Sequence, residues 1–241
     1  HLAGRGVTST LVAEEVPPLC HPLGPNNKLV FSTGFVTGTS APTSGRLSVG
    51  GKSPLTGGVK ESNAGTPWAS QLADMRIKAL VVEGQPKKKG KYWGASLTWD
   101  EKAGKPKVEF FDATSYTGKD VYEVYPKLYE KFGDKVSIAG CGMAGEHGYG
   151  NAGVVFNDME RRPSRYAGRG GLGSVMASKG LKFVVIDAKG APGVEIADKA
   201  LFEEGCKKMT DALRTHALTK PKGALNTYGT AVLINVLNEA G

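Results

Sequence analysis

The sequence has few of the side chains that usually hold metals or clusters. Its three cysteines, Cys20, Cys141 and Cys206, are far apart and form no C-x-x-C pair, and its four histidines are scattered. Three separate thiols cannot bind a four-cysteine iron–sulfur cluster, and no metal-ligand spacing is present. Cys141, in the Gly-rich stretch AGCGMAG, is either a reactive thiol or a small buried residue. The low cysteine content is typical of a reducing compartment, so we expect a cytoplasmic protein.

Long hydrophobic runs are also missing. No apolar stretch approaches the roughly 20 residues that span a bilayer, and no signal peptide is visible. We therefore expect no membrane partner. The chain begins at His1 instead of Met and ends within a helical pattern, which predicts a fragment of a longer protein. No Ser-His-Asp or Cys-His set for nucleophilic catalysis can be assembled from it.

The charge is basic, with 31 Lys and Arg against 23 Asp and Glu, a net +8. Such a balance permits an anionic partner. Part of the charge lies in PKKKGK (86–91), which we interpret as an exposed hairpin tip. It is either a solvated loop or a contact for nucleic acid. Zinc fingers, recognition helices and RNA-binding aromatic patterns are all missing, so we expect no nucleic-acid partner.

Glycine, serine and threonine are concentrated between residues 37 and 65. This segment holds seven glycines and nine Ser or Thr residues, with the cations Arg46, Lys52 and Lys60 spread through it. Gly-rich turns can bring successive backbone N–H groups together to bind an anion, and a nearby Arg adds charge-assisted hydrogen bonds. The alternative is a long flexible loop.

A second segment repeats this pattern. Residues 28–84 and 135–188 both read as strand, Gly-rich segment, short helix and strand, and one constant offset aligns Leu72 with Met176 and Lys78 with Lys182. Two copies indicate a duplicated domain with a pseudo-twofold axis, since a solenoid needs at least about three. The axis would bring two similar loops together, which favours a ligand with two phosphate-bearing halves.

Strand and helix patterns follow in mixed order, which predicts an α+β fold and not a doubly wound sheet. A polar turn between 91–100 and 107–113 predicts a β-hairpin, and residues 121–133 predict a helix. The glycines from 168 to 173 fit neither a dinucleotide fingerprint nor a P-loop. We expect one duplicated domain over residues 1–196 and the start of a helical domain over 197–241.

Several ordered motifs carry a resemblance that covers nearly the whole chain. They are TGTSAPTSGR (37–46), KSPLTG (52–57), SNAG (62–65), VVEG (81–84) and AGRGGLGSVMASKGLK (167–182). Together they resemble the N-terminal domain of the tungsten-dependent aldehyde ferredoxin oxidoreductase family. The resemblance implies two β-sheets packed face to face with flanking helices. It also implies an enzyme of anaerobes that oxidises aldehydes to carboxylates and passes electrons through a 4Fe–4S cluster to ferredoxin.

The resemblance implies a bis-pyranopterin cofactor of tungsten or molybdenum, resting on this domain. By position, the contacts in the first copy are Arg46, Asn63, Ala64 and Gly65. Those in the second copy are Arg165, Tyr166, Gly168 and Arg169. A Mg²⁺ ion bridging the two pterin phosphates would be held by Asn63 and the backbone carbonyl of Tyr166. The alternative for each arginine is a surface ion pair or a solvated side chain.

The remaining machinery is expected outside this chain. The cluster cysteines, the proton-transfer residues and the substrate channel belong to C-terminal domains, so this segment alone should be inactive. The implied partners are an aldehyde, ferredoxin or a similar carrier, those C-terminal domains and, in many relatives, a second subunit. The alternative function is a non-catalytic anion-binding or interaction module that keeps the same fold.

Overall fold

The computed structural model describes residues 2–88 and 90–241, which divide into two compact units. The first unit extends to Val194 without Ser40–Pro42, and it contains both β-sheets. The second comprises Ser40–Pro42 and Glu195–Gly241, and its regular structure is entirely helical.

The smaller sheet of the first unit is built from the first repeat. Its four strands pair antiparallel in the order β3-β2-β1-β4. They are β1 (Leu29–Thr33), β2 (Arg46–Lys52), β3 (Val59–Gly65) and β4 (Ala79–Val82). Helix α2 (Pro67–Asp74) connects β3 to β4.

The larger sheet has six strands in the order β6-β5-β10-β7-β8-β9. All of its pairs are antiparallel except β5 with β10. The strands are β5 (Trp93–Asp100), β6 (Lys105–Asp112), β7 (Ser137–Cys141), β8 (Val154–Phe156), β9 (Arg165–Ala167) and β10 (Leu181–Asp187). A 3₁₀ turn (Thr114–Tyr116) and three helices lie between them, namely α3 (Val121–Phe132), α4 (Met143–Glu146) and α5 (Leu172–Ser178).

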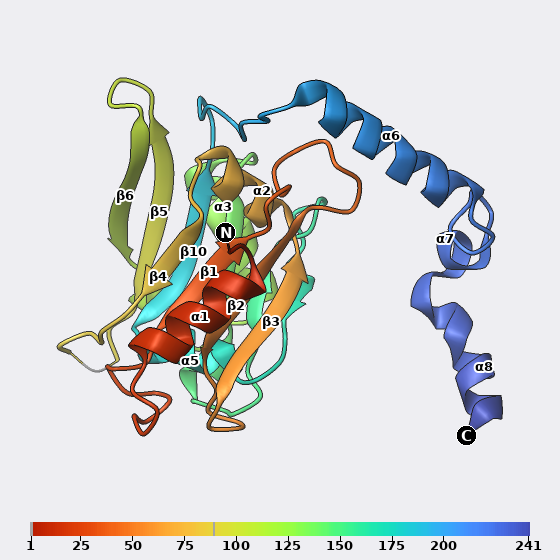
Figure 1. The fold of residues 1–241 in the computed structure, drawn as a ribbon. Helices are drawn as coiled ribbons and strands as arrows, with labels where there is room; N and C mark the ends of the chain where they lie inside the picture. The colour runs from red at the N-terminus through yellow and green to blue at the C-terminus, as the bar shows by residue number, and fades with distance from the viewer. Residues whose placement is uncertain (1, 89) are drawn as a thin grey trace. The chain divides into compact units, whose positions relative to one another are not determined.

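The strand order confirms the internal duplication. The first repeat forms β4-β1-β2-β3 with α2 before its last strand, and the second forms β10-β7-β8-β9 with α5 before its last strand. Every corresponding pair is antiparallel. The predicted hairpin β5–β6 is also confirmed, and it extends only the larger sheet, at one edge (Figure 1).

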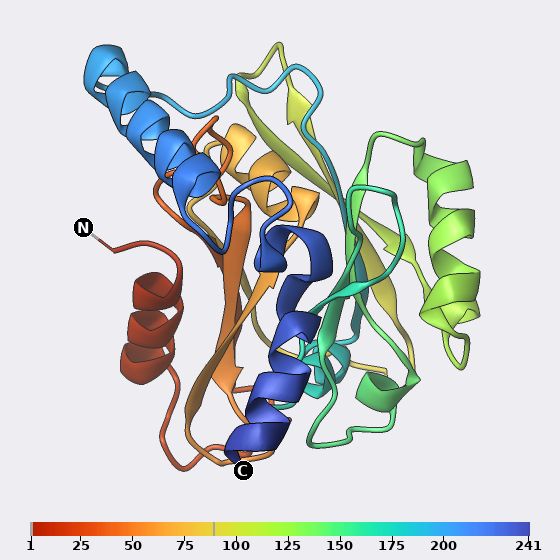
Figure 2. The same cartoon turned by 90° about the vertical axis from the view of Figure 1, so that its right-hand side faces the viewer.

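The two sheets pack face to face around a shared apolar core, which confirms the predicted fold class. Phe31 of the first repeat and Phe156 of the second both contact Trp68, with ring centroids 5.3 and 5.7 Å away. The Trp68 indole N–H donates to the Val184 carbonyl oxygen at 3.1 Å, so one side chain joins the two sheets. Figure 2 shows the sheets side by side, with α1 (Arg5–Glu15) outside the smaller sheet and α3 outside the larger.

Local sequence explains the flanking helix α3. The Asp120 carboxylate caps its first turn by accepting from the Tyr122 N–H at 2.7 Å, and Gly133 ends it with φ of 93°. Tyr125 and Leu128, at helical spacing, are fully buried against the outer face of the larger sheet. The predicted helix over residues 121–133 is thereby confirmed.

Two interpretations of loop-like sequence need correction. The Gly-rich segment 37–65 is mostly a β-hairpin and not a flexible loop, because β2 and β3 pair along their full length. The basic run 86–91 is not a hairpin tip. It connects β4 to β5, and these two strands belong to different sheets, since β4 pairs with β1 whereas β5 pairs with β6 and β10. Lys89 itself lies outside the described residues.

The helical unit contains α6 (Lys199–Thr215), α7 (Ala224–Tyr228), a 3₁₀ turn (Gly229–Val232) and α8 (Leu233–Ala240). Asp198 caps α6 by accepting from the Leu201 N–H at 2.9 Å. Among residues 2–88 and 90–241, no helix is long and apolar enough to cross a membrane.

Cys141, one of the three free cysteines, is fully buried on β7. Its thiol faces the backbone carbonyl of Leu181 at 3.5 Å. Burial raises the pKa of Cys141 to about 12, so a reactive thiolate is disfavoured. Of the two readings of Cys141, the structure supports the small buried residue.

Candidate functional site

The predicted contacts of the first repeat lie at the end of the β2–β3 hairpin. Arg46 is the cross-strand partner of Gly65, and Ser48 is the partner of Asn63. A methyl group added at Gly65 would meet Arg46 Cγ at 3.8 Å, so the arginine side chain lies across this glycine. Ala64 is buried in the core between the sheets, so only its backbone can reach a ligand.

The predicted contacts of the second repeat lie on β9 and the loop that follows it. Arg165, Tyr166, Gly168 and Arg169 are all exposed. Strand β9 forms the edge of the larger sheet, as β3 forms the edge of the smaller. Edge strands leave half of their backbone N–H and C=O groups without a strand partner, and such groups can bind a ligand.

These two edges lie side by side and run in opposite directions. The Arg169 N–H donates to Ser62 Oγ at 3.2 Å, and the Lys60 side chain packs against Gly170. Further along, Gly65 and Arg165 line one cavity. We call residues 60–66 and 165–170, together with Arg46 of β2 beside Gly65, the β3–β9 seam. The duplication thus brings together the equivalent segments of the two repeats, as the sequence predicted.

Glycines allow the loop after β9, the second half of the seam, to pack closely on residues 152–153 and these in turn on helix α5. A methyl group at Gly173 would lie 2.2 Å from the Gly153 carbonyl oxygen, and one at Gly153 would lie 3.0 Å from Gly168 Cα. Both distances are shorter than ordinary contacts between carbon and backbone atoms. Three backbone segments therefore stack through Gly168, Gly153 and Gly173. This stacking accounts for glycines that fit no nucleotide-binding motif.

The seam is rich in cations, and four of them make no ion pair with another described residue. Within the described part of the chain, no ion pair is made by Arg46, Arg165 or Arg169, or by Lys60. The alternative of a surface ion pair is therefore not observed for the three predicted arginines. Lys60 is a seam cation that sequence reasoning did not include among the contacts. No spacing along the chain could have indicated it, because Lys60 reaches the seam by packing against Gly170 of the other repeat.

Asp158 fixes the loop that carries Arg165. Its buried carboxylate accepts from the Ser164 hydroxyl at 2.8 Å, from Arg162 Nε at 3.0 Å and from the N–H groups of Glu160 and Arg162. Burial alone would raise the pKa of Asp158, but these hydrogen bonds outweigh it and lower the pKa to about 2. Beside this loop lies a cavity of about 230 Å³, lined by residues 45, 65–67, 70, 158–159 and 165.

Asn63 is held by one half of its amide. Its Nδ2 donates to the carboxylate of Glu61, while Oδ1 has no hydrogen-bond partner within the described residues. An amide oxygen is a ligand that Mg²⁺ accepts. The donor set of the seam therefore fits a bis-phosphate bridged by Mg²⁺: cations for the phosphates and an available amide oxygen for the metal.

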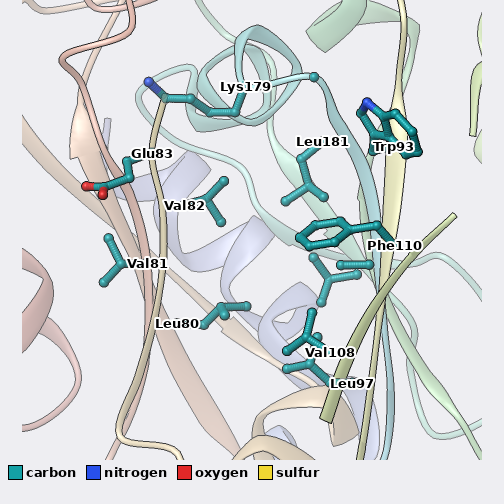
Figure 3. Close-up of a pocket in the computed structure, with 13 residues that line it drawn as sticks. Leu80, Val81, Val82, Glu83, Trp93, Leu97, Val108, Phe110, Lys179 and Leu181 are labelled. Atoms are coloured by element: carbon teal, nitrogen blue, oxygen red, sulfur yellow. The ribbon is translucent and has the colours of Figure 1, made fainter. Parts of the chain in front are cut away.

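A larger cavity of about 570 Å³ lies elsewhere, between β4 of one sheet and β5 and β6 of the other. Figure 3 shows its apolar centre, with the charged ends of Lys179 and Glu83 turned away from Leu181 and Phe110. Lys179 Nζ donates to the Gly24 carbonyl at 2.9 Å, and Glu83 is ion-paired with Lys28 at 3.0 Å. Both charged groups are already engaged within the protein, so the cavity lacks the convergent polar groups of the seam.

Comparison with known proteins decides the family. Residues 1–188 match the family described as "Aldehyde ferredoxin oxidoreductase, N-terminal domain". The chain belongs to this family. Tungsten-containing aldehyde ferredoxin oxidoreductases of Pyrococcus horikoshii and Pyrococcus abyssi are 41% and 40% identical to it over all 241 residues. The chain spans 37% of the length of these relatives.

Two further proteins show a more distant similarity, one in structure and one in sequence. The active-site complex BamBC of benzoyl-coenzyme A reductase, solved with 1,5-dienoyl-CoA, superposes with a TM-score of 0.78 at 27% identity. The match covers 88% of this chain and 30% of that one. A WOR-like subunit of an aliphatic sulfonate oxidoreductase from Pyrococcus furiosus is 28% identical over 81% of this chain and 31% of its own length. The chain is thus similar to enzymes named for different substrates.

Proposed function

We propose that this chain is the cofactor-binding domain of a tungsten or molybdenum bis-pyranopterin oxidoreductase. The observation that carries the proposal is the β3–β9 seam, where equivalent edges of two repeats meet and present four cations that make no ion pair with another described residue. A cofactor with two pterins has two phosphates, which suits a duplicated site. The names of the relatives support tungsten as the metal.

Each seam residue has a chemical role in this proposal. Arg46, Arg165 and Arg169 would bind the phosphates through charge-assisted hydrogen bonds. The exposed backbone at Gly168, and that of Ala64 and Gly65, would contact the pterins. Asn63 Oδ1 and the Tyr166 carbonyl would hold the bridging Mg²⁺. When bound, the cofactor supplies the two-electron chemistry, while the protein binds and orients it.

For the whole protein, we propose oxidation of aldehydes to carboxylates with ferredoxin or a similar carrier as electron acceptor. The 4Fe–4S cluster and the substrate pocket would come from sequence outside residues 1–241. Those further residues would also be the partners of the helical unit.

The test is the metal and pterin content of the full-length protein, purified anaerobically from a host that makes the cofactor. We expect about one tungsten or molybdenum and two pterins per chain. The double variant Arg46→Ala, Arg169→Ala should retain less than about a tenth of both, because two charge-assisted contacts of about 1.5–3 kcal/mol each are removed. The control Lys102→Ala, Lys105→Ala removes two exposed cations from the β5–β6 hairpin, and this variant should retain the metal and the pterins fully.

Wild-type protein without metal or pterin would overturn the proposal. The remaining function would then be the alternative, an anion-binding or interaction module with the same fold. Equal cofactor loss in the control variant would show that net charge, and not the seam, retains the cofactor.

A further inference from the structure

Glu61 lies at the centre of a polar network behind Asn63. Both residues are on β3, two positions apart and on the same face, beside Ser48 of β2. The Glu61 Oε2 atom accepts from Asn63 Nδ2 and, at 2.8 Å, from Ser48 Oγ. The network continues to α1, because the hydroxyls of Ser48 and Thr8 are 3.2 Å apart and Arg5 Nε lies 3.8 Å from Glu61 Oε1.

This network determines which way the Asn63 amide points. An ionised carboxylate can only accept hydrogen bonds, so the NH₂ half of the amide must face Glu61. The Oδ1 atom is then directed away from Glu61. With a donor in place of the carboxylate, the amide could turn over and direct Oδ1 toward residue 61.

We infer that Glu61 is a positioning residue for a divalent cation at Asn63. It holds the amide so that Oδ1 is presented as a metal ligand, and Ser48 holds Glu61 in turn. This inference rests on the proposed function, because it takes Asn63 as a ligand of the Mg²⁺ ion between the phosphates. Partners behind a metal ligand commonly change metal affinity 10- to 100-fold when they are mutated.

The negative charge of Glu61 could also attract the cation directly, without orienting the Asn63 amide. Two variants separate these effects. Glu61→Gln removes the charge and replaces a group that can only accept with an amide that can donate as well as accept. Ser48→Ala keeps every charge and removes only the hydroxyl that fixes Glu61. Positioning predicts weaker metal binding in both variants, whereas a simple charge effect predicts a loss only in Glu61→Gln.

The experiment uses the full-length protein with its cofactor, stripped of Mg²⁺ with EDTA. Mn²⁺ is titrated back, and free Mn²⁺ is followed by electron paramagnetic resonance. We expect the Mn²⁺ Kd to rise about 10- to 100-fold in Glu61→Gln and several-fold in Ser48→Ala. The matched control is Glu109→Gln, which removes an exposed carboxylate whose partner is Lys107 at 2.8 Å, and its Kd should not change.

Asn63→Ala separates failure of this inference from failure of the proposed function. If Asn63→Ala binds Mn²⁺ as the wild type does, Asn63 is not a ligand and the proposed metal site is wrong. If Asn63→Ala loses Mn²⁺ while Ser48→Ala binds it normally, the positioning role of Glu61 alone is overturned. Should Glu61→Gln fail to fold, the Ser48→Ala result decides the question.

Discussion

Replacing Gly173 with alanine tests whether the glycine stack under the seam is as close as the structure describes. Two effects of this change oppose each other. Alanine is favoured over glycine within a helix by about 1 kcal/mol, which would stabilise α5. The added methyl group, however, would lie 2.2 Å from the Gly153 carbonyl oxygen and 3.0 Å from the Ala152 carbonyl carbon. Both are backbone atoms, which cannot rotate out of the way.

The clash should outweigh the helix preference. Overpacking a tight site costs typically 1–3 kcal/mol, and contact with backbone places this one near the upper end, at about 3 kcal/mol. Subtracting the helix gain leaves a net loss of about 2 kcal/mol. For a chain of 150–250 residues, each kcal/mol shifts Tm by about 2–4 °C, so we expect Tm to fall by about 4–8 °C.

Thermal unfolding of the full chain, followed by circular dichroism, measures this shift. Gly205→Ala is the matched control, since Gly205 lies within helix α6 and an added methyl group meets nothing within 4 Å. It should leave Tm unchanged or raise it. Gly168→Ala adds a methyl group inside the seam at an ordinary 3.7 Å from Tyr166 Cβ, so its effect on stability should stay within about 0.5 kcal/mol. A Gly173→Ala protein as stable as the wild type would refute the close approach of α5 to residues 152–153.

Two further predictions concern the loop of Asp158 and the contact between the sheets. Because the folded pKa of Asp158 is lowered to about 2, its ionised form stabilises the fold above about pH 4, and this contribution is lost as the pH falls toward 2. Asp158→Asn should therefore lower the free energy of unfolding by about 1–2 kcal/mol at pH 7, and by less at pH 3. Urea unfolding of both proteins at the two pH values measures this, and a loss of stability that is the same at pH 7 and pH 3 would contradict it. Trp68→Phe removes the hydrogen bond to the Val184 carbonyl and leaves a void in the shared core, so the free energy of unfolding in urea should fall by about 2 kcal/mol. A fall below about 0.5 kcal/mol would show that the indole does not join the sheets.

The sequence predicted those features that local pattern determines. The aligned positions Leu72 and Met176 revealed the duplication because both are fully buried in helices at the same place in each repeat. The motif residues Arg46 and Asn63 were found through family resemblance, and the structure places them on neighbouring strands. Whether they bind a cofactor remains a prediction.

Features that depend on distant pairing could not be predicted. Strand β9 has only three residues, two of them exposed, so it carries no alternating apolar pattern. The run 86–91 looked like a hairpin tip because nothing local indicates that β5 pairs with β10, about 90 residues later. The role of Lys60 depends on packing against Gly170 in the other repeat, a contact that no spacing along the chain reveals.

The parallel pairing of β5 with β10 has a consequence for synthesis on the ribosome. All four strands of the smaller sheet lie within residues 29–82, so its backbone pairing can form as soon as this stretch has emerged. The larger sheet must wait, because β10 joins the β5–β6 hairpin to β7, β8 and β9. Until residue 187 has emerged, the apolar face of the smaller sheet has no complete partner, and exposed apolar surface of this kind favours aggregation. The nascent chain should therefore be most prone to aggregate in the interval between the emergence of β4 and that of β10.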